Sequence, residues 1–95
     1  MTIADGLRTS LGSNNFPLIK EHVDDFVLVS ETEIVDAMQL VYERMKCVIE
    51  PSGAVALAGV LQQREQLKGK NVGIMLCGGN VDLTEYFNDL RKTLK

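Results

Sequence analysis

The sequence VGIMLCGGN, residues 72–80, joins an unbroken apolar run to a glycine-rich turn. An apolar run of this length predicts a buried strand. In open α/β sheets, ligands bind beyond the carboxyl ends of the strands, where loops lead into helices. Cys77, Gly78, Gly79 and Asn80 occupy such a position, and glycine lets the backbone approach a ligand closely. This predicts a small-molecule site, although such turns also occur without ligands and Cys77 also suits a small buried apolar position.

A second apolar run, FVLV at residues 26–29, also has the length of a strand. Helical patterns alternate with the two runs in the order loop, helix, strand, helix, helix, strand, helix. This order predicts an α/β unit with parallel strands and right-handed crossovers. Sheets usually have about four to six strands, so two strands covered on both faces need further neighbours. We therefore expect residues 1–95 to be a single α/β segment, the C-terminal part of a larger protein.

The clearest helix begins after Ser30, which forms an S-x-x-E capping box with Glu33. Its expected buried stripe consists of Ile34, Ala37, Met38, Val41, Met45 and Val48. Pro51 is expected to end this helix and to start the next one, because proline is tolerated in a first turn but not in a helix interior. The second helix is expected to reach Gly69. The small residues in its first half predict close packing against a sheet or a ligand.

The two ends of the chain have weaker patterns. Residues 1–14 show no periodicity and are predicted to be a loop, with a frayed terminus as the simplest interpretation. A short helix is expected from Asn15, as its cap, to about Asp24. A last helix is expected after Asp82 or Thr84. Its apolar stripe would consist of Leu83, Tyr86, Phe87, Leu90 and Leu94.

The composition indicates one globular domain or part of one. The chain has 95 residues, 45% of them hydrophobic, with 10 basic and 13 acidic side chains and a net charge of -3. Basic residues are scattered among acidic ones, which argues against nucleic-acid binding. No apolar run approaches the roughly 18 residues of a membrane span, and no signal peptide is visible, so the default expectation is the cytosol or an organelle matrix. Cys47 and Cys77 are predicted to be free thiols.

Glu50 is a further candidate functional residue. It precedes Pro51 at a helix junction that we expect to be partly buried, where a carboxylate must be paired or hydrogen-bonded. The alternative is a helix-terminal glutamate that faces solvent. His22, the one histidine, lies in a polar segment and is predicted to be on the surface. No His or Cys pair has the spacing of metal ligands, so no metal site is predicted in this chain.

Four motifs occur in a fixed order: TIADGL at 2–7, ERMK at 43–46, IEPSGA at 49–54 and CGGNVDL at 77–83. In this order and spacing they resemble the C-terminal third of the fold-type II pyridoxal-phosphate enzymes. The resemblance is strongest to eukaryotic-type serine racemase and its relatives, the serine and threonine ammonia-lyases (dehydratases). It covers nearly the whole chain. It implies that these residues belong to the large domain of such an enzyme, with parallel strands covered by helices.

The resemblance implies a cofactor-binding role for three residues. Cys77 matches the position whose neutral hydroxyl or thiol hydrogen-bonds the pyridine nitrogen of pyridoxal phosphate. Racemases usually have serine there, so Cys77 leans towards the dehydratases, some of which have cysteine. Glu50 matches a carboxylate close to the cofactor ring, and Gly78 matches the adjoining backbone.

The resemblance also implies contacts with two smaller molecules. Asp5, Gly6 and Thr9 match a loop that lines the amino-acid substrate pocket, where this sequence has threonine in place of the usual serine. The loop of residues 1–14 would then belong to the active site. Lys46 and Asn80 match positions that contact an activating nucleotide, ATP, in serine racemase.

The catalytic machinery of the family is only partly represented. The motif with the Schiff-base lysine and the glycine-rich loop for the cofactor phosphate have no counterpart here, so no catalytic residue is expected within this segment. The acidic residues that hold an activating divalent cation are also expected outside it. The resemblance implies a homodimeric lyase or isomerase of amino-acid metabolism as the parent protein, which we expect in the cytoplasm, and inertness of these residues alone. The alternative is a non-catalytic α/β interaction module or pseudoenzyme fragment.

Overall fold

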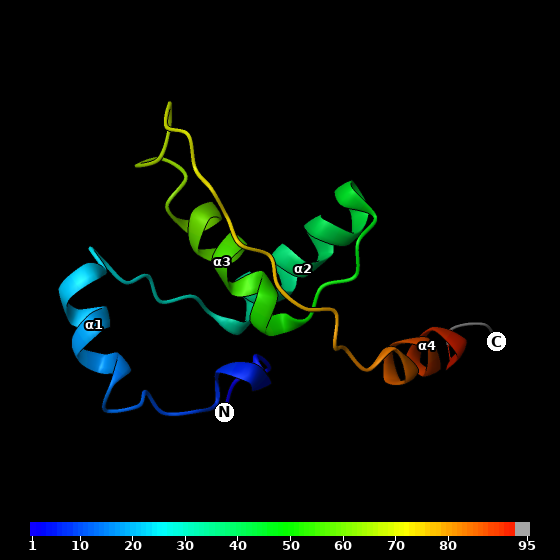
Figure 1. The fold of residues 1–95 in the computed structure, drawn as a ribbon. Coiled ribbons are helices and arrows are strands. Elements are labelled where there is room, and N and C mark those ends of the chain that lie inside the picture. The colour runs from blue at the N-terminus through cyan, green and yellow to red at the C-terminus, as the bar shows by residue number, and fades with distance from the viewer. Residues whose placement is uncertain (93–95) are drawn as a thin grey trace.

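One short 3-10 helix and four α-helices make up the regular structure of residues 1–92, the part of the chain that this computed structural model describes. Helices α2 and α3 pack against each other, and α3 also contacts η1. Figure 1 shows this pair at the centre, with α1 and α4 at opposite sides. The elements are η1 (Asp5–Leu7), α1 (Asn15–His22), α2 (Glu31–Met45), α3 (Pro51–Gln62) and α4 (Leu83–Lys92).

Helix α2 begins as its capping box predicts. The Ser30 hydroxyl accepts the Glu33 N–H at 3.2 Å, and the Glu33 carboxylate accepts the Ser30 N–H at 2.7 Å. The predicted C-terminal end is wrong. The helix stops at Met45 because Lys46 takes a left-handed conformation, with φ at 57°, and donates its N–H to the Tyr42 carbonyl.

Helix α3 begins at Pro51 as predicted, but it is shorter than predicted. It ends at Gln62, and turns follow up to Leu67 and Gly69. Its small residues pack closely, as expected: Gly53, Ala54 and Ala58 are buried. They meet the buried face of α2. The core consists of Ala4, Ile34, Ala37, Val41, Ile49, Ala54 and Ala58.

The two predicted strands are not formed within residues 1–92, so the prediction of a parallel sheet is not confirmed. A strand requires a neighbouring strand for its backbone hydrogen bonds, and residues 26–29 and 72–77 have none in the described part of the chain. Their side chains nevertheless follow a strand-like alternation. Leu76 packs against the core, whereas Met75 is 77% exposed and Leu28 is 90% exposed. The helices therefore cover one face of each segment and leave the other open.

The outer helices begin within one residue of their predicted starts. Helix α1 has Asn15 as its first residue, so the prediction of Asn15 as the cap is wrong by one residue: the N-cap is Asn14, whose side chain makes no capping hydrogen bond. Asp82 caps α4 by accepting the Thr84 N–H at 2.8 Å. The apolar stripe of α4 stays 41–46% exposed at Leu83, Phe87 and Leu90, and Leu94 lies outside the described residues.

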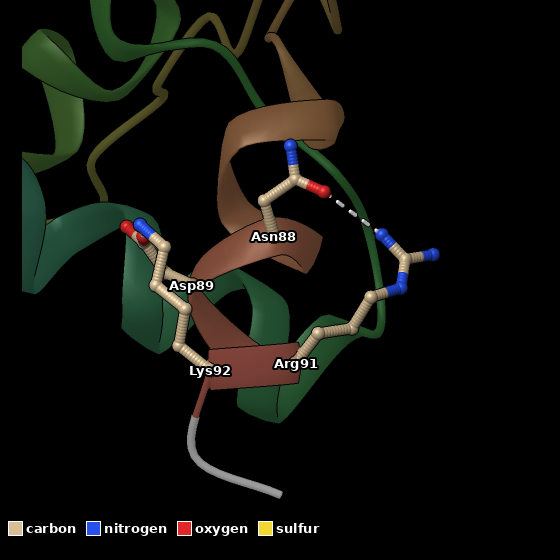
Figure 2. A network of polar contacts seen from close by, with 4 residues as sticks. All are labelled: Asn88, Asp89, Arg91 and Lys92. Atoms are coloured by element: carbon tan, nitrogen blue, oxygen red, sulfur yellow. Dashed lines mark hydrogen bonds and ion pairs between the residues drawn. The ribbon is translucent and has the colours of Figure 1, made fainter.

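The last turn of α4 carries its basic residues on the polar side. The Arg91 guanidinium donates to Asn88 Oδ1 at 3.1 Å, and Lys92 Nζ pairs with Asp89 Oδ1 at 2.7 Å (Figure 2). Both lysine and arginine lie near the negative end of the helix dipole, where cations are favourable. Both pairs lie on the exposed surface of α4.

The described chain is open in shape. Its radius of gyration is 15.7 Å and its extents are 55 × 36 × 19 Å. A compact domain of this length would have a radius of gyration of about 12 Å. No helix in residues 1–92 is long and apolar enough to cross a membrane.

Candidate cofactor and substrate site

Three segments far apart in the sequence meet at the first turn of α3. From η1, the Gly6 N–H donates to the Ser52 hydroxyl at 2.9 Å. From the segment after residue 72, the Gly78 carbonyl accepts the Glu50 N–H at 3.3 Å. The structure thus brings together the loop predicted to bind substrate and the residues predicted to line the cofactor. Figure 1 shows η1 and the orange segment near residue 78 both close to the start of α3.

Gly78 has both a special conformation and a tight contact. Its φ is +76°, in the left-handed region that favours glycine. A Cβ atom added to Gly78 would overlap the Glu50 carboxylate. The Glu50 side chain therefore lies directly against the backbone of the glycine turn, and only glycine fits this arrangement without displacement.

Gly53 is a site-building residue that sequence reasoning missed. A Cβ atom added there would overlap the Cys77 carbonyl oxygen and lie 3.1 Å from Ile49 Cγ1. The absence of a side chain allows the first turn of α3 to press against the backbone of Cys77. The signal in the sequence was a glycine in the first turn of a predicted helix, because the lack of a side chain allows another backbone to approach closely.

Cys77 and Glu50 differ in their surroundings. The thiol of Cys77 is free and exposed, so the alternative of a buried apolar cysteine is wrong for the described chain. Glu50 is half-buried, as expected at this junction. A thiol is a weak hydrogen-bond donor, whereas a carboxylate only accepts. Glu50, Cys77 and Gly78, here called the cofactor wall, thus bring a thiol and a carboxylate into neighbouring segments, while their role in binding a cofactor stays a prediction.

The N-terminal loop is anchored, so the interpretation as a frayed terminus is wrong for residues 3–7. Ala4 is buried in the core. The Ile3 N–H donates to the Glu31 carboxylate at 2.7 Å. Asp5 Oδ1 also accepts the Gly6 N–H, at 2.9 Å. The loop is therefore tied to the starts of both α2 and α3.

Two carboxylates at the start of α2 are stabilised in their charged form. The Thr2 hydroxyl and then the Ile3 N–H hold the pKa of Glu31 below its usual 4.5, and the positive charge of Arg8 acts in the same direction. The Ser30 N–H, followed by the Gln62 amide, lowers the pKa of Glu33. Each shift follows from hydrogen bonds to the charged carboxylate. Glu31 therefore links α2 to the N-terminal loop electrostatically.

The remaining predicted site residues lie at the edges of this region. Thr9 is exposed, two residues beyond the end of η1. Lys46 Nζ donates to the Glu43 carbonyl at 2.7 Å. Asn80 is exposed, and a Cβ added to its neighbour Gly79 would lie 3.5 Å from the Val48 carbonyl. The segments that contain Lys46 and Asn80 thus run close together, while the roles of both residues stay predictions.

Two hollows lie beside α2 and α3, and the first of them borders the site at Pro51. A groove of about 630 Å³ lies between α2, residues 47–49 and the start of α4, with Met38, Tyr42, Cys47, Ile49, Val81 and Leu83 in its lining. A second hollow of about 420 Å³ lies between α3 and the segment that contains Val27. In the described residues, no group of three or more His, Cys, Asp or Glu side chains could hold a metal ion.

Comparison with known proteins identifies the family. Residues 1–78 match the family described as pyridoxal-phosphate dependent enzyme. The chain belongs to that family. It is 55% identical over 85 residues to serine racemase from Dictyostelium discoideum, a match that covers 87% of this chain and 26% of that protein. It is 50% identical over 86 residues to L-threo-3-hydroxyaspartate ammonia-lyase from Saccharomyces cerevisiae, covering 90% of this chain and 26% of that protein.

A solved structure of maize serine racemase has the same fold over nearly the whole chain. The TM-score is 0.86 at 41% identity, and the match covers 99% of this chain and 30% of the maize protein. The chain thus spans about a quarter of the length of the curated relatives it matches. Its helices and open segments correspond to part of a larger fold-type II pyridoxal-phosphate enzyme fold.

Proposed function

We propose that this chain is the C-terminal portion of a pyridoxal-phosphate-dependent serine/threonine ammonia-lyase (dehydratase) or serine racemase that acts on β-hydroxy amino acids. The proposal is carried by the meeting of η1, Glu50 and Gly78 at the first turn of α3. This arrangement joins three of the four motifs that resemble the family. The similarity to a serine racemase and a hydroxyaspartate ammonia-lyase supports it.

The chain's own residues would form one wall of the active site. Pyridoxal phosphate supplies the electron sink that makes the α-proton of an amino acid acidic. Cys77 would offer its thiol as a neutral donor to the pyridine nitrogen, while Glu50 and Gly78 would line the ring. Asp5, Gly6 and Thr9 are assigned to the substrate side of the site. None of these residues is proposed to move the α-proton.

The proposal includes inertness of the isolated 95 residues, because no counterpart of the Schiff-base lysine motif was found in them. Borohydride reduction in the presence of pyridoxal phosphate, followed by peptide mass spectrometry, should find no lysine modified in stoichiometric amount. A stoichiometric adduct on Lys20, Lys46 or any other lysine would contradict this. The protein expressed with its upstream sequence should form pyruvate and ammonia, or D-serine, from L-serine.

A second candidate is a non-catalytic interaction module or pseudoenzyme fragment. The open apolar faces at Leu28 and Met75 favour it, because surfaces of this kind often bind other proteins. The two candidate functions predict different coding sequences upstream of Met1. A lysine motif and a glycine-rich loop encoded there support the enzyme, whereas a start codon at Met1 with neither motif supports the module.

The proposal extends to the location, assembly and regulation of the full-length protein. We assign the full-length protein to the cytoplasm, as a homodimer activated by a divalent cation and by ATP, with Lys46 and Asn80 near the nucleotide. Their adjacent segments support the shared role. Lys46→Ala should reduce the activation by ATP in the full-length protein and leave the ATP-independent rate unchanged. Equal activation of both proteins would contradict the assignment.

A further inference from the structure

We propose that Ser52 is a positioning residue that fixes the substrate loop, residues 5–9, against the cofactor wall formed by Glu50, Cys77 and Gly78. The terms substrate loop and cofactor wall rest on the proposed function. The hydrogen bond between Ser52 and Gly6 is observed in this chain whatever its function. Ser52 touches neither the substrate nor the cofactor in this proposal. It acts through the backbone of Gly6.

The contact is close and specific. The Ser52 hydroxyl accepts the Gly6 N–H at 2.9 Å, and Ser52 itself is half-buried in the first turn of α3. A Cβ added to Gly6 would lie 2.8 Å from Ser52 Oγ and 3.3 Å from Ser52 Cβ. The two residues are therefore packed so tightly that a side chain at position 6 would separate them.

Gly6 has a second acceptor, but that acceptor cannot position the loop. Asp5 Oδ1 lies 2.9 Å from the same N–H. Asp5 moves together with Gly6 because both belong to η1. Among the described residues, only the hydroxyl of Ser52 ties this N–H to another element. Loss of the hydroxyl would leave the internal bond of the loop intact and remove the hydrogen bond that ties Gly6 to α3.

The same helical turn also holds the cofactor wall. Glu50, two residues before Ser52, donates its N–H to the Gly78 carbonyl at 3.3 Å. Gly53, the residue after Ser52, lies against the Cys77 carbonyl. Substrate loop and cofactor wall are thus attached to Glu50, Ser52 and Gly53, at the start of the same helix. The hydrogen bond of Ser52 therefore sets the distance between the substrate loop and the cofactor wall.

The other end of the loop has anchors of its own. Ala4 is buried in the core, and the Ile3 N–H donates to Glu31 at 2.7 Å. The bond to Glu31 lies at the start of α2 and does not involve the turn that contains Ser52. Removal of the Ser52 hydroxyl should therefore loosen residues 5–9 and leave residues 2–4 in place, which a general loss of folding would not do.

The test uses the full-length protein that contains this chain, with Ser52→Ala, Ser52→Thr and a control, Ser13→Ala, at an exposed serine. Amide hydrogen exchange is measured on peptides that cover residues 3–9. Ser52→Ala should raise exchange at residues 5–9 by roughly five- to tenfold, the effect of losing one hydrogen bond. Ser52→Thr keeps the acceptor and should match the parent protein, as should Ser13→Ala.

Steady-state kinetics with L-serine provide the second measurement. Ser52→Ala should raise KM by roughly the same factor as exchange, while kcat and the pyridoxal phosphate content of the purified protein stay within about twofold. Gly6→Ala, with Ser52 intact, should raise amide exchange at residues 5–9 in the same way, because the added methyl group pushes the loop from the hydroxyl. This variant keeps the test decisive if Ser52→Ala fails to fold.

The outcomes separate this proposal from the proposed function. Unchanged exchange in Ser52→Ala would overturn it, and so would an equal change in Ser52→Thr. A fall in cofactor content with unchanged KM would also overturn it, because Ser52 would then act on the cofactor wall alone. If the exchange result is as expected but the protein does not turn over L-serine, the contact is supported and the proposed substrate is wrong.

Discussion

Gly78 has both a left-handed backbone conformation and a close contact with Glu50, whereas Gly69 has the conformation alone. A comparison of the two glycines therefore separates the cost of backbone strain from the cost of the contact. The φ of Gly78 is +76° and its Cα faces the Glu50 carboxylate, whereas Gly69 has φ at +80° and nothing within 4 Å of an added Cβ. Gly69→Ala should lower the free energy of unfolding by about 1 kcal/mol, the cost of a left-handed alanine. Gly78→Ala should cost about 2–4 kcal/mol because overpacking adds to this strain. Urea unfolding measures both.

The double variant Glu50→Ala/Gly78→Ala tests the cause of the larger loss. Removal of the carboxylate eliminates the overlap, so the double variant should be more stable than Gly78→Ala alone. The remaining deficit should approach that of Gly69→Ala. If the double variant loses as much stability as Glu50→Ala and Gly78→Ala together, the two residues do not interact in this way and the overlap is relieved by another movement.

The charge of Glu31 makes the N-terminal loop sensitive to acid. The Thr2 hydroxyl and the Ile3 N–H lower the pKa of Glu31 in the folded chain, so the unfolded chain binds more protons between the lowered pKa and about 4.5. The contribution of Glu31 is therefore complete above pH 4.5 and is lost as the pH falls through the lowered pKa. An NMR titration of the Ile3 amide should show this transition.

Glu31→Gln should remove the transition from the Ile3 amide. Glu33→Gln is the matched control, because the Ser30 N–H lowers the pKa of Glu33 at the same helix start without involving the loop. That variant should leave the Ile3 titration unchanged. If the Ile3 amide still shows the transition in Glu31→Gln, a group other than Glu31 is titrating.

At the scale of elements, the contact between α2 and α3 depends on small side chains. Ala54 is fully buried on α3, where it meets the face of α2 that contains Ala37, whereas Ala56 is exposed on the same helix. Ala54→Leu should lower the free energy of unfolding by about 1–3 kcal/mol through overpacking. Ala56→Leu should change it by less than about 0.5 kcal/mol. Equal effects in thermal unfolding would contradict the observed packing.

Local sequence signals predicted the helix starts correctly where the residues that form the start lie within one or two turns of each other. The capping box of Ser30 and Glu33 and the start of α3 at Pro51 involve residues within three positions of each other. The end of α2 was missed because the left-handed conformation of Lys46 leaves no mark in a lysine side chain. A glycine or asparagine there would have revealed it.

At the scale of the molecule, the open apolar faces have consequences of their own. Leu28 and Met75 are the most exposed large side chains of residues 26–29 and 72–77. The isolated chain should self-associate through them, as detected by sedimentation velocity. Leu28→Lys combined with Met75→Lys should reduce this association.

Leu18→Lys on α1 is the control for that experiment, because Leu18 is exposed but belongs to neither segment. It should leave the association unchanged. In the full-length protein the Leu28 and Met75 substitutions should instead lower the melting temperature, because neighbouring strands would cover these faces. An unchanged melting temperature would contradict a covered sheet.

The sequence by itself determined the family, through four motifs in order, and the starts of the helices, through caps and proline. It also predicted two strand-like segments whose side chains do alternate. Only the tertiary structure showed that Gly6 reaches Ser52, that Gly53 touches Cys77 and that neither segment has a strand partner within residues 1–92. The physical reason is range: caps and periodicity act within a few residues, whereas these contacts join residues that are distant along the chain and depend on its whole path.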